Sequence, residues 1–181
     1  LAGCLCGIRK HTGKVLYDKT EWTAKKRLKE SYMVMQDVNH QLFTESVMDE
    51  LLISMKNPDE QQALEILAQL GLSEYAKRHP MSLSGGEKQR VAIATALASD
   101  REYVVMDEPT SGLDYKHMKE VALCLKQLKE LGKSVFVITH DVELIYHCCP
   151  YVVHIEAGKV LNQYAIDKST HTLLRDYFLL Q

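Results

Sequence analysis

The chain has 181 residues, of which 46% are hydrophobic and 25% are charged. These values are ordinary for one globular domain, and they exclude a disordered chain, a collagen-like repeat and a coiled-coil rod. The 22 basic and 24 acidic residues leave a formal net charge of −2, so the chain as a whole has no basic field that would hold nucleic acid or anionic lipid.

The sequence gives no sign of membrane insertion or secretion. No apolar run reaches the roughly 18 to 20 residues that cross a bilayer, and the N-terminus has no charged region ahead of its apolar stretch. The five cysteines form no pair of C-x-x-C motifs, so we expect reduced thiols rather than disulfides or a metal site. These features predict a soluble, non-secreted, cytosolic chain.

Strand and helix patterns alternate along the chain, which predicts an α/β fold. In chain order, the first half predicts a short strand, an apolar strand and two helices, over residues 15–17, 32–35, 46–53 and 60–70. The apolar strand stops at Gln36, and the second helix stops at Gly71, a residue type that is common just after helices.

The second half continues the alternation. It predicts a helix, a strand, a second helix, a second strand and a short third helix, over residues 86–98, 103–106, 115–131, 134–139 and 142–148. A hairpin over 151–156 and 160–164 and an amphipathic helix over 170–180 complete the chain. The strands over 103–106 and 134–139 are almost wholly apolar, which is typical of parallel strands that are buried on both faces.

Three of the predicted strands end in polar residues that are suited to catalysis: Gln36, the pair Asp107–Glu108, and His140. The carboxyl ends of parallel strands meet at one edge of a sheet, so we expect these side chains to converge on one crevice. Asp107 could hold Mg²⁺ directly or through water, and Glu108 could orient or deprotonate an attacking water. His140 could contact a γ-phosphate, and Gln36 could ligate the metal or position the water. Each residue alone is also compatible with an ordinary cap or turn.

A second candidate site begins the helix predicted after residue 83. Ser84 and Glu87 are spaced as a capping box. A cap does not explain the two glycines, Gly85 and Gly86. Two glycines at a helix start let backbone N–H groups approach an anion, and the helix dipole adds to the attraction. A phosphate is therefore the natural ligand.

Together these segments resemble the ATP-binding-cassette (ABC) ATPases. The resemblance rests on a signature loop at Leu83–Gln89, a Walker B strand at Tyr103–Glu108, the loop after it at Ser111–Asp114, a switch histidine at His140 and a Q-loop glutamine at Gln36. Glu87 stands where glutamine is commoner in the family.

The resemblance implies a fold and a domain organisation. The fold is α/β, with a P-loop NTPase-like, mostly parallel sheet core and an inserted α-helical subdomain. Residues 1–36 and about 100–181 would form the core, and about 37–99, which include the signature loop, would form the helical subdomain.

The resemblance also implies ATP and Mg²⁺ as cofactors and assigns a role to each motif residue. Asp107 would bind Mg²⁺, Glu108 would be the general base, and His140 would contact the γ-phosphate. Gln36 would link the metal to a transmembrane partner. The ATP of the opposite protomer would be bound by Ser84, Gly85, Gly86 and Gln89, and Asp114 would cross the interface of a head-to-tail dimer.

One family motif is absent from these 181 residues. The phosphate-binding loop has the form G-x-x-x-x-G-K-[ST], whereas Gly7 to Val15 has five residues between its glycines and Val15 in place of Ser or Thr. We therefore expect the chain to be a truncated domain that begins just after this loop and lacks the first core strand. Such a fragment should bind ATP weakly or not at all and be inactive alone.

The spacing of the motifs favours a transporter. Gln36 and Ser84 are 48 positions apart, which is room for a compact helical subdomain and not for the long coiled coil of the DNA-repair relatives. Gln36 to Phe43 resembles the Q-x-P-x-x-Q-L-F pattern of energy-coupling-factor and cobalt-type importers, with Val38 in place of Pro. That resemblance implies uptake of a vitamin or metal ion, a place on the cytoplasmic face of the cell membrane, and an integral membrane partner. Gln41, Leu42 and Phe43 are the candidate contacts, and loop packing is the competing interpretation of these three residues.

Two other functions stay open at this point. The first is a non-transport ABC ATPase that acts on ribosomes or nucleic acid, which only the basic stretch Lys25–Lys29 supports. Glu21 and Glu30 flank that stretch, so a solvated face explains it better, and we expect no nucleic-acid partner. The second is a degenerate cassette that serves as a structural dimer partner, against which the intact Glu108 and His140 argue.

Overall fold

The computed structural model describes residues 1–167, 170 and 174. The chain separates into two compact units, Leu1–Thr139 and His140–Gln181, and each unit is described by itself below. The helix predicted over 170–180 lies almost entirely outside the described residues. The division into a core and a helical subdomain stays a prediction.

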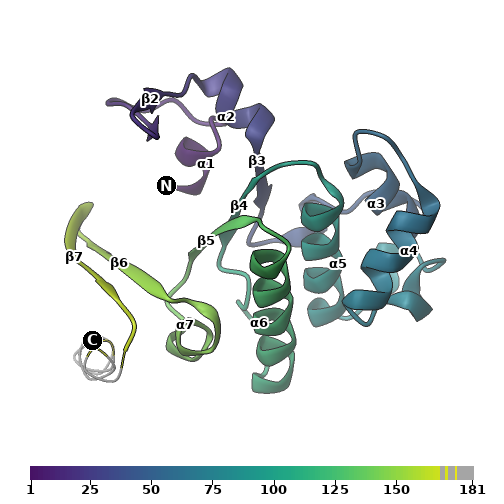
Figure 1. The fold of residues 1–181 in the computed structure, drawn as a ribbon. Coiled ribbons are helices and arrows are strands. Elements are labelled where there is room, and N and C mark those ends of the chain that lie inside the picture. The colour runs from purple at the N-terminus through teal and green to yellow at the C-terminus, as the bar shows by residue number, and fades with distance from the viewer. Residues whose placement is uncertain (168–169, 171–173, 175–181) are drawn as a thin grey trace. The chain divides into compact units, whose positions relative to one another are not determined.

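A parallel sheet of three strands forms the centre of the first unit. Its strands are β3 (Ser31–Val34), β4 (Tyr103–Asp107) and β5 (Ser134–Ile138), in the order β3-β4-β5 (Figure 1). Val34 pairs with Met106, and Met106 pairs with Val137. The register brings the carboxyl ends of all three strands to the same edge, as the sequence predicts.

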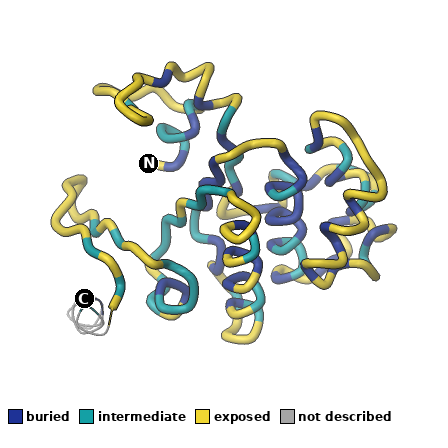
Figure 2. The backbone as a smooth tube through the Cα atoms, in the orientation of Figure 1, coloured by how far each residue is buried: buried dark blue, intermediate teal, exposed yellow. Residues whose placement is uncertain are grey.

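Two helices cover one face of this sheet. They are α5 (Gly85–Ala98) and α6 (Tyr115–Glu130), which lie side by side in Figure 1 and contact β3 and β5, respectively. Val34, Val104 and Met106 lie on this side of the sheet and are fully buried, and much of α5 is dark in the burial colours of Figure 2. The match between an apolar strand face and the apolar sides of two helices is what holds this layer together.

The opposite face of the sheet is covered by the short N-terminal helix α1 (Ala2–Leu5). Ala2 and Cys6 form a buried cluster with Val105, against which Leu5, Met33 and Ile138 pack. The next elements are β1 (Leu16–Tyr17), β2 (Thr20–Glu21) and α2 (Ala24–Glu30). The strand predicted over 15–17 is confirmed as β1. Strand β2, which has two residues, and helix α2, whose seven residues are mostly charged, were not predicted.

The strand β5 differs from its prediction. Its apolar sequence predicts burial on both faces, but its residues are only partly buried and Phe136 is 48% exposed. In the described sheet β5 pairs with β4 alone, so it is an edge strand. The apolar pattern indicates that these side chains favour burial, but their exposure in the structure depends on which strands and helices lie beside β5.

The segment between β3 and α5 is helical, as predicted. It contains η1 (Val38–His40), α3 (Val47–Ser54), α4 (Glu60–Gln69), η2 (Ser73–Tyr75) and η3 (Pro80–Ser82). Ser46 and Asp59 cap α3 and α4 with their side-chain oxygens, and Gly71 adopts a φ of +65° just after α4. Both helices pack on α5, so this segment is anchored to the helix that begins at the candidate signature loop.

The second unit contains one helix and one hairpin in its described part. Helix α7 (Val142–Cys148) is capped by Asp141, whose Oδ1 accepts from the Leu144 N–H at 3.1 Å. Strands β6 (Tyr151–Glu156) and β7 (Lys159–Ala165) pair antiparallel. All three elements confirm their predictions. Among the described residues of the whole chain, no helix has the length and apolar character needed to cross a membrane.

Candidate functional site at the carboxyl edge of the sheet

Three of the predicted site residues lie at one edge of the first unit's sheet. Asp107 is the last residue of β4 and pairs with Ile138 of β5, and Glu108 follows directly. Gln36 follows the end of β3 by two residues and is exposed. Parallel strands therefore bring an amide and two carboxylates to the same edge, where ligands of such sheets bind.

Glu108 has an unusual backbone. Its φ is +49°, in the left-handed region that residues with a side chain seldom adopt. Its N–H donates to the carbonyl of Ile138 at 2.8 Å, and the Thr139 hydroxyl donates to Glu108 Oε2 at 3.3 Å. Such conformations gather at functional sites and persist only where the surroundings hold them. The sequence analysis did not single out Thr139, since its only signal was its place at the end of β5.

The number of acidic side chains at the end of β4 bears on which metal ion could bind there. Among the residues that the structure describes, no group of three or more His, Cys, Asp or Glu side chains could enclose a metal ion. Mg²⁺ is usually held by one or two carboxylates together with substrate phosphates and water. Asp107, at the end of β4, fits that pattern as the one protein carboxylate beside substrate phosphates.

The start of α5 has the capping box that the sequence predicts. The Ser84 N–H donates to Glu87 Oε2 at 2.7 Å, and the Glu87 N–H donates to Ser84 Oγ at 3.4 Å. Hydrogen bonding from the Ser84 N–H lowers the pKa of Glu87, and a hydrogen bond from Tyr75 lowers it further. Ser84 and Gly85 are exposed, and a Cβ added to Gly85 would meet only Leu113 at 3.9 Å. The backbone there is open to an approaching anion.

Gln89, like Gly86, is buried, unlike the other two predicted nucleotide contacts at the start of α5. Its side chain is 5% exposed, whereas Ser84 and Gly85 lie at the surface. Its Nε2 has no hydrogen-bond partner among the described residues. A buried amide without a hydrogen-bond partner is uncommon. A polar ligand bound near the start of α5 would supply the missing partner.

Asp114 stands at the start of α6, where its exposed carboxylate caps the helix. Its Oδ1 accepts from the His117 backbone N–H and is paired with His117 Nδ1, each at 2.9 Å. The backbone N–H of His117 is the main reason why the pKa of Asp114 lies below its usual value. The carboxylate is therefore held charged and in place at the surface.

His140 opens the second unit. It is exposed and directly follows Thr139, and Asp141 after it caps α7. The structure therefore places His140 just beyond the end of β5, as the strand pattern predicts.

The three predicted membrane-partner contacts, in the segment after Gln36, have different environments in the structure. Gln41 Nε2 donates to the Tyr32 hydroxyl at 3.1 Å and to the Met33 carbonyl at 3.2 Å, and Gln41 Oε1 accepts from the Met35 N–H at 3.1 Å. Leu42 is buried, whereas Phe43 is 72% exposed. Gln41 bonds to β3 and Leu42 is buried, so of the three only Phe43 has an apolar side chain at the surface.

Two residues that the sequence analysis missed fix this segment in place. Glu50 of α3 is buried, and its Oε1 accepts from the N–H groups of Phe43 at 2.5 Å and Thr44 at 2.7 Å. Lys88 of α5 donates to Asn39 Oδ1 at 3.0 Å. A glutamate within a helix normally indicates a solvated face, so no local pattern could have revealed the role of Glu50.

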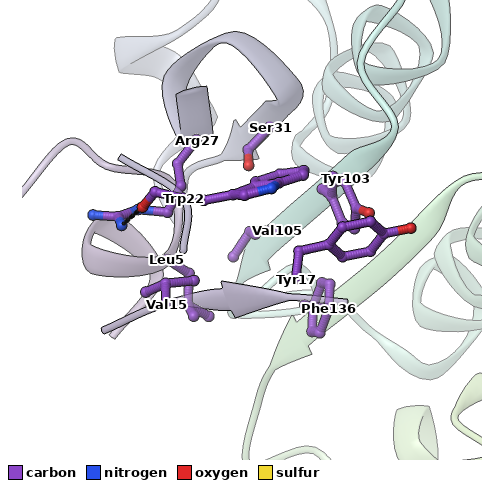
Figure 3. Close-up of a pocket in the computed structure, with 9 residues that line it drawn as sticks. All are labelled: Leu5, Val15, Tyr17, Trp22, Arg27, Ser31, Tyr103, Val105 and Phe136. Carbon is purple, nitrogen blue, oxygen red and sulfur yellow. Dashed lines mark hydrogen bonds between the residues drawn. The ribbon is translucent and has the colours of Figure 1, made fainter. Parts of the chain in front are cut away.

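An apolar pocket of about 100 Å³ lies on the α1 side of the sheet, away from these residues (Figure 3). The rings of Tyr17, Trp22 and Tyr103 gather there, with centroids 4.9 to 5.4 Å apart. Arg27 also lines it and donates to the Trp22 carbonyl at 2.7 Å. The lining has no carboxylate, so this pocket is not the site for a metal and its nucleotide.

Comparison with known proteins identifies the family. The model of the family described as "ABC transporter" matches residues 1–111, more than half of the chain. The chain belongs to the ABC transporter family. The resemblance stated from the motifs is thereby confirmed.

Individual relatives and solved structures agree with this assignment. A putative ABC transporter ATP-binding protein of Treponema denticola is 41% identical over 169 residues, which cover 93% of this chain and 35% of that protein. The arginine transport ATP-binding protein ArgV of Corynebacterium glutamicum is 36% identical, with 88% of this chain and 65% of that protein covered. The structure of cbiO1 from Clostridium perfringens, part of the ABC transporter complex cbiONQ, matches with a TM-score of 0.81 and 26% identity.

The ABC ATPase fold is also confirmed by the cbiO1 match, which covers 98% of this chain and 74% of that one. The chain spans about a third of the length of the Treponema relative, so the activity, substrates and partners of the whole protein are proposals.

Proposed function

We propose that this chain is part of the ATP-binding and ATP-hydrolysing subunit of an ABC importer. The observation that carries the proposal is the pair Asp107–Glu108 at the carboxyl edge of the sheet, with Glu108 held at a φ of +49°. Relatives whose names include arginine, methionine and histidine transport support the importer class.

In this proposal Asp107 and Glu108 have different tasks. Bound Mg²⁺ would supply positive charge against the phosphates, and Asp107 is the side chain that would hold it. Glu108 would accept the hydrogen bond of the attacking water and take its proton. The Thr139 hydroxyl donates to Glu108 Oε2, so it keeps one carboxylate oxygen in a defined direction. Gln36 and His140 would act on the metal and the γ-phosphate, respectively.

The start of α5 would act on the ATP of a second cassette in a head-to-tail dimer. Ser84 Oγ accepts the Glu87 N–H, and its own O–H would donate to a phosphate oxygen. Gly85 and Gly86 would add backbone N–H groups, Gln89 would add an amide, and Asp114 would cross the dimer interface. No segment of the 181 residues matches the motif G-x-x-x-x-G-K-[ST]. We therefore propose that residues outside this sequence hold the β- and γ-phosphates.

The membrane partner would contact the segment after Gln36, with Phe43 as its apolar anchor. The protein would then be peripheral on the cytoplasmic face of the cell membrane. The resemblance of Gln36–Phe43 to energy-coupling-factor importers leads us to propose a vitamin or metal ion as the solute. Uptake assays against amino acids, the solutes in several relatives' names, would decide between the classes.

The test is the rate of ATP hydrolysis by the full-length gene product. Glu108→Gln should lower turnover at least about 100-fold, the range for loss of a general base, and leave Mg-ATP affinity within threefold. The matched control is Glu102→Gln, which changes an exposed glutamate just before β4 and should keep the wild-type rate. Wild-type turnover by Glu108→Gln would contradict the proposal.

The interpretation as a nucleic-acid or ribosome ATPase rests on the basic stretch Lys25–Lys29, whose lysines are exposed but whose one arginine is buried. Arg27, at the centre of the basic stretch, is buried and bonds to the Trp22 carbonyl and to His11 Nε2. Its charge therefore serves the fold and is not presented to a polyanion.

A further inference from the structure

The loops that begin α5 and α6 touch through the ring of His117. A Cβ added to Gly86 would lie 2.7 Å from His117 Cδ2 and 3.0 Å from its Cγ. Side chains do not approach this closely, so residue 86 must be glycine for the imidazole to lie where it does. The His117 side chain is 34% exposed, with one edge of its ring against the backbone of the signature loop.

The same ring also holds Asp114. His117 Nδ1 and Asp114 Oδ1 are 2.9 Å apart, in addition to the backbone hydrogen bond at the helix cap. Nearby, Leu113 is the closest side chain to Gly85. His117 therefore contacts Gly86 on α5 and Asp114 at the start of α6 at the same time.

One turn further along, a second contact fixes the two helices. The Arg90 guanidinium of α5 forms an ion pair with Glu120 of α6, and both side chains are largely buried. Beyond this ion pair, the starts of the two helices meet through the imidazole of His117, which is against Gly86, and through Leu113, which is nearest to Gly85.

We propose that His117 is a positioning residue that fixes the signature loop Leu83–Gln89 and the loop Ser111–Asp114 as one rigid unit. The proposal rests on the proposed function, in which Ser84 and Asp114 face the same dimer interface. Two loops that meet one nucleotide must keep their spacing, because a displacement of about 1 Å lowers a rate by up to about 100-fold. His117 touches no reacting atom and acts through the residues on either side of it.

The experiment measures the kcat and Mg-ATP affinity of the full-length gene product. His117→Ala should lower kcat about tenfold and leave the affinity within twofold, since the ring is not a ligand in this account. His117→Asn should recover the rate to within threefold of wild type, because the Asn amide can donate to Asp114 from nearly the place of the imidazole Nδ1. Lys116→Ala, an exposed change in the same helical turn, is the matched control and should have no effect.

A second pair of variants keeps the test independent of folding. Gly86→Ala places a methyl group against the imidazole and should be nearly inactive. In Gly86→Ala with His117→Ala the methyl group enters the released space, so this double variant should be at least threefold more active than Gly86→Ala alone.

The outcomes separate the two proposals. If Glu108→Gln abolishes turnover but His117→Ala keeps the wild-type kcat, the positioning role is wrong and the proposed function stands. If His117→Ala and His117→Asn lose rate equally, or if the double variant is no better than Gly86→Ala, the ring is only a packing element. If Glu108→Gln hydrolyses ATP normally, both proposals are overturned.

Discussion

Glu108 is held in a left-handed backbone conformation by the atoms around it. For a residue with a side chain this conformation costs about 1–2 kcal/mol. The hydrogen bond from its N–H to Ile138 and the one that its carbonyl accepts from the Ser111 N–H, at 2.8 and 3.1 Å, offset that cost. This conformation follows the end of β4 at Asp107, and in our proposal the two neighbouring carboxylates have different tasks.

The buried side chain of Glu50 should contribute measurably to the stability of the fold. Its buried carboxylate accepts from the backbone N–H groups of Phe43 and Thr44. Glu50→Ala leaves both donors without a partner, so we expect the free energy of unfolding to fall by about 1–3 kcal/mol in urea denaturation. The exposed Glu65 is the control, and Glu65→Ala should change stability by less than about 0.5 kcal/mol. Equal stability of the Glu50 and Glu65 variants would show that the 43–44 loop does not depend on the carboxylate.

The site residues that could be predicted from the sequence are those at the end of an apolar run or at the start of a helix pattern. Asp107, Glu108 and His140 each end an apolar run, and Asp114 begins a helix. Glu50 contacts Thr44, Thr139 contacts Glu108 and His117 contacts Gly86, which are 6, 31 and 31 positions away, and no spacing rule links such pairs. The burial of Gln89 and Leu42 also depends on which helix packs on them, which the sequence pattern does not specify.

Among the elements, the start of α5 is the best predicted and β5 the least. A capping box needs only residues 84 to 87, and the structure has both of its hydrogen bonds. The exposure of β5 depends on a neighbour on its second side, and the described sheet has none. Local chemistry can therefore be predicted for a helix end, whereas the environment of a strand is a property of the whole sheet.

The capping box predicts how stability depends on pH. The fold lowers the pKa of Glu87 below 4.5, mainly through the Ser84 N–H. The ionised carboxylate therefore stabilises the folded state above pH 4.5, and this contribution is lost as the pH falls through the lowered pKa. Glu87→Gln should be slightly less stable than wild type at pH 7, by less than about 1 kcal/mol because the site is partly exposed. The difference should shrink as the pH falls below 4.5 and through the lowered pKa of Glu87.

Urea titrations at pH 7, 5, 4 and 3 measure this difference. Glu45→Gln, at an exposed position, provides the comparison and should follow the wild type at every pH. A Glu87→Gln variant that stays equally less stable at all pH values would mean that the charge of Glu87 does not contribute.

At the scale of the whole molecule, we propose that the chain supplies most groups of an ABC ATP site but not its phosphate-binding loop. Carboxylates, signature loop and Asp114 are all within the first unit, and family membership covers residues 1–111. The remaining requirement is a loop whose amides and lysine hold the β- and γ-phosphates. The central claim is therefore that these 181 residues provide hydrolytic groups and that nucleotide affinity comes from elsewhere in the longer protein.

The most direct measurement is calorimetric titration of Mg-ATP into residues 1–181 and into the full-length gene product, with circular dichroism confirming that both are folded. We predict tight binding by the full-length protein and at least about 100-fold weaker binding by residues 1–181, the loss expected when the main phosphate contacts are absent. Equal affinity of the two would contradict the account, because another segment of this chain would then have to hold the phosphates.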